Sequence, residues 1–239
     1  MRKLDQSDQK NQIQGQSQIL GDFIWAMCLL CWILILVVPS ARSFFIKVTE
    51  AHPYMGGFFK FTILASMGDL LGFRILNNRW KIPQNVLQKA FVWGIIGMMV
   101  TLIFSVYMGG VSFAQSIGRL PFAGHVVAQA FLGSFIMNVT FGPMMYVYHI
   151  FGDKLMASLF SKASERPTLK EMVDTTDWYT LVSFSWLKTC LFVWVPCHTI
   201  VFLMPSEYRV LASAFLSILL GLIIAYSKKN AVSSTTTCE

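Results

Sequence analysis

The chain has 239 residues, of which 55% are hydrophobic and only 13% are charged, with a mean hydropathy of +0.57. These values are typical of a membrane protein and exclude a soluble enzyme. The net charge is +7, from 19 Lys and Arg against 12 Asp and Glu. In so apolar a chain this excess indicates loops facing anionic lipid headgroups rather than a nucleic-acid surface.

The distribution of polar residues divides the chain into an amino-terminal tail, a central apolar domain and a carboxy-terminal tail. Residues 1–20 are rich in Gln and Asp, lack the features of a signal peptide or presequence, and predict a disordered polar tail. Residues 21–228 form a single predicted transmembrane domain, and the Ser- and Thr-rich residues 229–239 predict a second disordered tail.

Six stretches are apolar enough to span a bilayer, which predicts an all-α, polytopic transmembrane helix bundle. Pro39 predicts a kink in the first of them, and Gly142-Pro143 predicts either a break in the fourth or a long tilted helix. No charge occurs in residues 90–118 or 120–152. The six predicted spans are residues 23–46, 53–75, 86–111, 120–151, 181–204 and 210–226.

The distribution of Lys and Arg among the connections supports this division, because positive charge gathers on the cytoplasmic side. Thirteen of these residues fall in the amino terminus, residues 74–89, residues 154–170 and residues 228–229, whereas four fall on the other side. We therefore expect six spans with both termini cytoplasmic, in a bacterial cytoplasmic membrane or an organelle membrane. The polar connection from residue 153 to 180 predicts a short amphipathic helix at residues 168–174.

Three full charges lie well inside the predicted spans: Lys60, Asp69 and Lys188. Lys60 and Asp69 lie about 13 Å apart on opposite faces of one helix and cannot pair. Asp69 and Lys188 have matching depths, so we expect them to meet inside the bundle, directly or through water. Either lysine could instead extend its stem to the headgroups. Asp69 is too short for that and should face the interior.

Other polar residues of the spans, above all Asn138 and His198, are candidates for a pore lining or for hydrogen bonds between helices. Gly68 and Gly72 flank Asp69 with a spacing that lets a second helix approach closely. The sequence has no motif for nucleophilic catalysis, a nucleotide or a metal, and Cys28-x-x-Cys31 lies in an apolar helix without a second such pair. We therefore expect no enzyme activity, no cofactor and no metal.

The residues His52-Pro53, Lys60 and Gly68-Asp69 resemble the opening motif of the Mpv17/PMP22 family of small membrane proteins. Two further segments are similar to motifs of that family, and they follow in the right order. These are Gly142-Pro143 with Tyr148 and Asp153, and Trp194 with Phe202, Pro205, Tyr208 and Arg209; Lys170 and Asp174 also match. The resemblance implies a channel or pore for small solutes.

Three functions are compatible with these features. The first is a weakly selective channel for small solutes or ions, embedded in the lipid bilayer, with Asp69 and Lys188 beside its path. The others are a membrane scaffold without transport, and a protein that binds a lipid or small apolar ligand between Trp186, Trp194, Phe184 and Phe192. The sequence leaves a homo-oligomer open. It also predicts that Glu50 and Arg209, at the same membrane surface, close one mouth of the bundle.

The topology can be tested by single-cysteine labelling from each side of the membrane. Ser116→Cys and Ser164→Cys should react from opposite faces, because the charge count separates their connections. Reaction of both positions from the same face would contradict the six-span topology.

Overall fold

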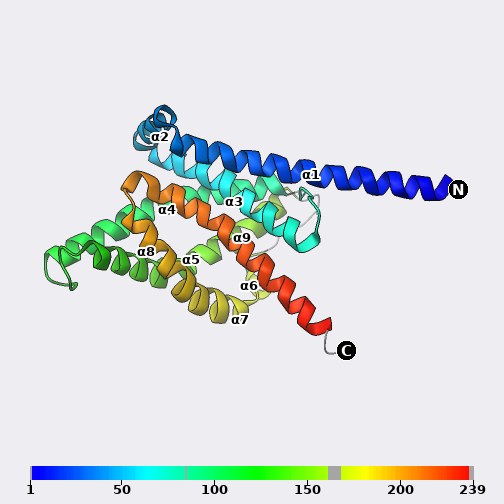
Figure 1. Ribbon diagram of the computed structural model, residues 1–239. Helices are drawn as coiled ribbons and strands as arrows, with labels where there is room; N and C mark the ends of the chain where they lie inside the picture. Colours follow the sequence, from blue (N-terminus) through cyan, green and yellow to red (C-terminus); the bar gives the residue numbers. More distant parts are fainter. Residues whose placement is uncertain (1, 84, 161–167, 237–239) are drawn as a thin grey trace.

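The computed structural model describes residues 2–83, 85–160 and 168–236, and the side chains of residues 15–83, 85–160, 168–219 and 221–222. Every regular element in this part of the chain is a helix (Figure 1). The elements are α1 (Arg2–Val37), α2 (Pro39–Ala51), α3 (Pro53–Asn77), α4 (Val86–Ser116), α5 (Val126–Leu159), α6 (Leu169–Asp174), α7 (Trp178–Thr180), the π-helical segment η1 (Leu181–Trp194), α8 (Val195–Leu203) and α9 (Ser206–Thr236).

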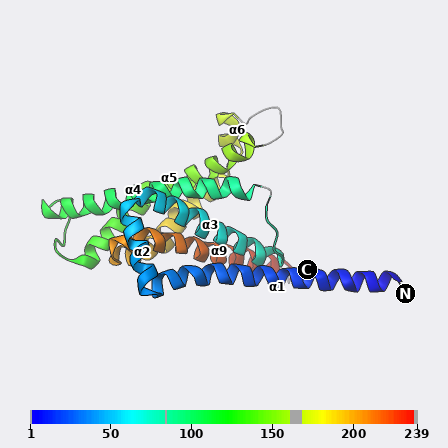
Figure 2. The ribbon, with the colours of Figure 1, turned by 90° about the horizontal axis from the view of Figure 1, so that it is seen from above.

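Two prolines divide the amino-terminal part into three helices. Pro39 begins α2 and Pro53 begins α3, each at the first turn, where a proline costs no hydrogen bond. Residues 23–46 are therefore not one span: α1 ends at Val37, and α2 runs crosswise to the long helices (Figure 2). The kink that Pro39 predicted is confirmed as a helix boundary.

The later helices differ from their predicted forms in two ways. α5 continues through Pro143, so the break at Gly142-Pro143 is absent and the long-helix alternative holds. The next helix is continuous from Trp178 to Leu203, but residues 181–194 of it are π-helical. Pro196 lies just beyond this segment, and π-helical turns are frequent at functional sites.

Among the residues whose side chains are described, four helices are long and apolar enough to cross a membrane: Gly15–Val37 within α1, Val86–Ser116, Val126–Leu159, and Trp178–Leu203. Many large apolar side chains on them are exposed, among them Phe192 at 77% and Ile200 at 66%, as lipid-facing residues would be. The protein is therefore an all-α, membrane-embedded bundle. α3 is not among the four, because it carries Lys60, Asp69 and Arg74.

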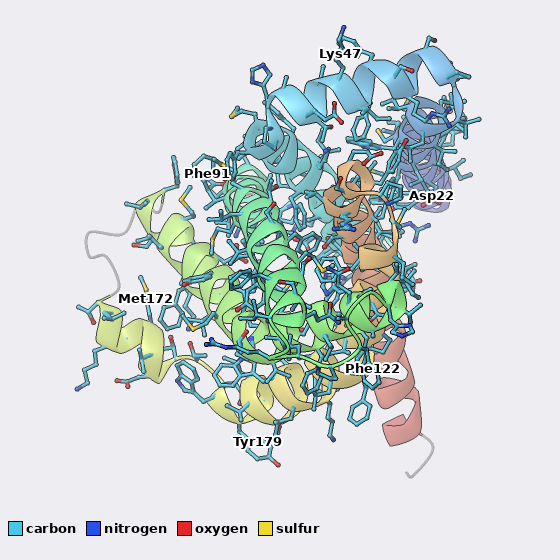
Figure 3. The ribbon with its side chains drawn as sticks, turned by 90° about the vertical axis from the view of Figure 1, so that its left-hand side faces the viewer. Asp22, Lys47, Phe91, Phe122, Met172 and Tyr179 are labelled. Carbon is cyan, nitrogen blue, oxygen red and sulfur yellow. The ribbon has the colours of Figure 1, made fainter. Side chains whose placement is uncertain are left out.

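Successive long helices run in opposite directions, so their connections gather at two ends. We call the end with the α2–α3 corner the Glu50 end and the end with the α3–α4 connection the Lys89 end. In Figure 2 both chain termini lie toward the Lys89 end, whereas α2 and the α4–α5 connection lie at the other. Figure 3 faces the Glu50 end, where Lys47 of α2 and Phe122 of the α4–α5 connection are labelled.

α3 is the central helix of the bundle and touches its neighbours through glycines. A methyl group on Gly68 would lie 2.7 Å from the Ser217 carbonyl oxygen of α9, and one on Gly221 would lie 2.6 Å from the Gly68 oxygen. Gly57 of α3 and Gly97 of α4 approach each other as closely on the other side. The close helix contact predicted at Gly68 and Gly72 is confirmed.

Polar contacts at the Lys89 end fix α1 against this centre. Arg74 pairs with Asp22 at 3.1 Å, and the Trp80 indole nitrogen donates to the same carboxylate at 2.7 Å. Deeper in the bundle, the Trp25 indole donates to the Met67 carbonyl at 3.0 Å. These contacts hold the apolar helix α1 along α3.

The predicted tails and surface helix can also be compared with the structure. α1 already begins at Arg2 and α9 continues to Thr236, so helix replaces the disordered chain expected over most of residues 1–20 and 229–239. The short helix expected at residues 168–174 is confirmed as α6, whose first turn is capped by Thr168 and Glu171. Ser164 lies outside the described residues.

The glycine contacts predict a large difference between two similar substitutions. Gly68→Ala should destabilise the protein by about 1–3 kcal/mol, because the new methyl group would push backbone against backbone. Gly109→Ala, on an open face of α4, is the control and should leave stability nearly unchanged. Unfolding in detergent measures both, and equal losses would contradict the close contact.

Candidate functional site

A cavity of about 230 Å³ lies in the middle of the bundle, enclosed by α3, α4, α5, α9 and the helix from η1 to α8. Its wall combines aromatic side chains with a smaller number of polar ones. The aromatic members include Phe61, Trp93, Phe104, Phe141 and Trp194, and the polar members are Asp69, Asn138, Tyr146, His149, His198, Ser213 and Ser217. An apolar wall with a few polar groups is the usual composition of a ligand or solute site.

Asp69 lines this cavity, although part of the residue is exposed at the surface of the bundle. Its Oδ2 accepts a hydrogen bond from the Trp93 indole nitrogen at 3.0 Å. The Trp93 ring in turn packs on His149, with ring centroids 4.3 Å apart. The carboxylate is therefore held by a hydrogen bond from α4, beside an imidazole of α5.

A direct ion pair between Asp69 and Lys188 is absent from the described side chains, and a contact through water stays a prediction. Lys188 is exposed on η1, and the two ion pairs among the described side chains are Arg74–Asp22 and Lys89–Asp153. Equal depth in the membrane does not decide which face of a helix a residue occupies, and the π-helical winding of η1 turns Trp194 rather than Lys188 toward the cavity. Arg74, the other cation near Asp69 in sequence, is paired with Asp22.

Asn138 and His198 belong to a buried hydrogen-bonded cluster. Nδ1 of His198 lies 3.3 Å from Asn138 Oδ1, and its Nε2 lies 3.3 Å from Ser213 Oγ. Asn138 also donates to the Ser134 carbonyl at 2.8 Å, and Ser134 donates to the Val195 carbonyl at 2.7 Å. The cluster joins α5, α8 and α9, which confirms the interhelical role predicted for these residues.

Lys60 extends toward α2 at the Glu50 end. Its side chain is 3% exposed, its ammonium donates to Thr49 Oγ1 at 3.0 Å, and it lies 4.7 Å from the centroid of the Phe45 ring. Both partners belong to α2, so Lys60 joins α3 to the helix that crosses the Glu50 end.

Two further hollows lie at opposite ends of the central cavity. The Lys89 hollow, about 260 Å³, is lined by residues of α3, α4 and α9 at the Lys89 end and shares Asp69 with the central cavity. The Lys60 hollow, about 360 Å³, lies at the Glu50 end and shares Phe104. The three hollows therefore follow one another along the bundle, with Asp69 at one junction and Phe104 at the other.

The residues of the family-like motifs occupy the corners and seams of this arrangement. His52 and Pro53 form the α2–α3 corner, while Pro205 and Tyr208 stand at the α8–α9 corner, where Arg209 donates to the Met204 carbonyl at 2.9 Å. Gly68 lies where α3 contacts α9, and Gly142 and Trp194 line the central cavity. Pro143 lies inside α5, and Asp153 pairs with Lys89 at 3.8 Å.

Glu50 and Arg209 both line the Lys60 hollow, which confirms that they lie at the same end of the bundle. They form no ion pair in the part of the chain that the structure describes. The two residues thus border one mouth of the bundle without closing it.

Sequence reasoning missed Trp93 and Phe104, the residues that stand beside the two junctions. A signal for Trp93 was present, because Asp69 and Trp93 each lie about two helical turns from the α3–α4 connection and must therefore have similar depths. No comparable signal marks Phe104, one of 20 phenylalanines in the chain.

The chain was compared with protein-family models, with curated proteins and with solved structures, and none of them matches it. Within the described ranges, no three His, Cys, Asp or Glu side chains are grouped as metal ligands would be.

The partner of Asp69 can be verified by double-mutant cycles. Asp69→Ala with Trp93→Phe should show a coupling on the order of 0.5–3 kcal/mol, because each change removes the same hydrogen bond. Asp69→Ala with Lys188→Met should be additive. Unfolding in detergent gives both values, and strong coupling to Lys188 would indicate a contact through water.

Proposed function

We propose that the protein forms a weakly selective channel for small solutes or ions. The observation that carries this proposal is the series of three hollows from the Lys89 end to the Glu50 end, which share Asp69 and Phe104. A path built this way needs only small movements at two junctions to become continuous. Channels use hydrophobic constrictions of this kind to exclude water when closed.

The charges along the path support weak rather than strong selectivity. Asp69 stands at the junction with the Lys89 hollow, whereas Lys60 and Arg209 line the hollow at the other end. Rings of one sign select strongly against ions of that sign. Because these charges have opposite signs, neither cations nor anions meet a favourable environment throughout.

The alternation of the helices supports a six-span topology for this channel. α3 and α9 run between the same two ends as the four apolar helices named above, and α3 contacts α4 on one side and α9 on the other. Neighbouring helices bury Lys60, and Asp69 and Arg74 each have a polar partner, which favours the crossing of a bilayer by α3 despite its charges. With the basic connections at the Lys89 end, both termini would be cytoplasmic, in a bacterial or organelle membrane.

The motif residues support a relationship to the Mpv17/PMP22 family within this proposal. His52-Pro53 and Tyr208-Arg209, far apart in sequence, lie at the same end of the bundle, and Gly68 makes a close contact with α9 beside Asp69. The motifs thus belong to positions that shape the path and its mouth.

Binding of a small apolar ligand is a second candidate, favoured by the aromatic wall of the central cavity. Six Phe, Trp and Tyr side chains line about 230 Å³, and the polar groups among them could orient one end of a ligand. Lipid copurified inside the bundle, without conductance, would favour this function over a channel. A protein with neither property would be a scaffold.

The channel can be tested by recording conductance of the purified protein in planar bilayers. Phe104→Ala should raise the conductance severalfold, because it removes the aromatic side chain at one junction, and Asp69→Asn should shift the selectivity away from cations. Phe192→Ala, 77% exposed on η1, is the matched control and should behave as the wild type. Absence of conductance in the wild type would refute the channel.

A further inference from the structure

Lys60 is the only buried residue with a formal charge among those whose side chains the structure describes. A buried charge is expensive unless an opposite charge and hydrogen bonds compensate for it. An ammonium group has three N–H donors, and here one of them is used, by Thr49. The Phe45 ring gives a second, weaker contact.

No described carboxylate lies within ion-pair distance of the Lys60 ammonium. Two carboxylates line the same hollow, Glu50 of α2 and Glu207 of α9, but neither forms an ion pair with Lys60, and Glu50 is exposed. The countercharge that a buried ammonium requires is therefore missing from the protein's own side chains.

A second cation lines the same hollow. Arg209 uses its Nε to bind the Met204 carbonyl, and its guanidinium carbon lies 5.9 Å from the centroid of the Phe202 ring. Its terminal Nη groups have no described acceptor. The Lys60 hollow thus presents unused donors from two cations around about 360 Å³ of space, within the usual range for a small-molecule site.

We propose that the Lys60 hollow binds a small organic anion through a carboxylate group. Lys60 supplies the charge at the buried floor of the site, and Arg209 supplies a planar pair of donors suited to carboxylate oxygens. This inference goes beyond the channel, because the site needs no conduction to be occupied.

The Glu50 carboxylate would compete with such a ligand for the cations of the hollow. It borders the hollow, follows Thr49 directly in α2, and carries the same functional group that the ligand would bring. Glu50→Gln should therefore tighten binding by lowering the negative charge around the site.

Saturation-transfer NMR with sodium propionate, on the purified full-length protein in a maltoside detergent, tests the site directly. Propionate should bind the wild type, whereas uncharged propionamide should not. Lys60→Met should weaken binding roughly tenfold or more, and Lys60→Arg should retain it, because the charge remains. Lys188→Met removes an exposed lysine and should have no effect.

Two controls keep the result interpretable. Thermal melting establishes that Lys60→Met is folded, and Arg209→Gln tests the same site from α9 without touching the Lys60–Thr49 contact. Added phosphatidylglycerol should leave propionate bound if the natural ligand is a soluble carboxylate. Displacement at low lipid concentration would instead assign the anion site to a lipid headgroup.

The outcomes separate this site from the channel. The anion site would be overturned if the wild type did not bind propionate, or if neither Lys60→Met nor Arg209→Gln weakened the binding. Conductance could still be present in either case, and the channel would then stand without the anion site. A Lys60-dependent propionate site in a protein without conductance would refute the channel and support the site alone.

Discussion

The close approach of α3 to α4 and α9 is the constraint on which the rest of the structure depends. Glycines at 57, 68, 97 and 221 bring the backbones together at points where even a methyl group would meet a carbonyl oxygen. In a lipid environment, packing of this kind replaces the hydrophobic effect as the force between helices. It also explains how α3 can carry Lys60, which is buried between neighbouring helices, whereas Asp69 is exposed beside the central cavity.

The central position of α3 gives its two charges different tasks. Asp69 reaches a cavity and is held by the Trp93 indole, whereas Lys60 is enclosed by α2 and lacks a carboxylate partner among the described residues. Charged side chains without an ion-pair partner inside a transmembrane bundle are costly, so their presence favours a functional role over a structural one. The proposed path and the proposed anion site are two consequences of the same arrangement.

The buried cluster around His198 stabilises the opposite wall of the cavity. His198 lies between Trp194 and Phe202 and joins Asn138 to Ser213 through its two ring nitrogens. These groups satisfy one another's hydrogen bonds, whereas His149 Nε2 and Asp153 Oδ1 are buried without a described hydrogen-bond partner.

The sequence by itself determined the all-α membrane class, the positions of most helices, the corner at Pro39 and the close contact at Gly68, because apolar length, proline and glycine act locally. It also identified Lys60, Asp69, Asn138 and His198 as the polar residues of the interior. Only the tertiary structure decided their partners. Rotation of each helix about its axis placed Trp93 rather than Lys188 beside Asp69, and the folding back of α2 buried Lys60.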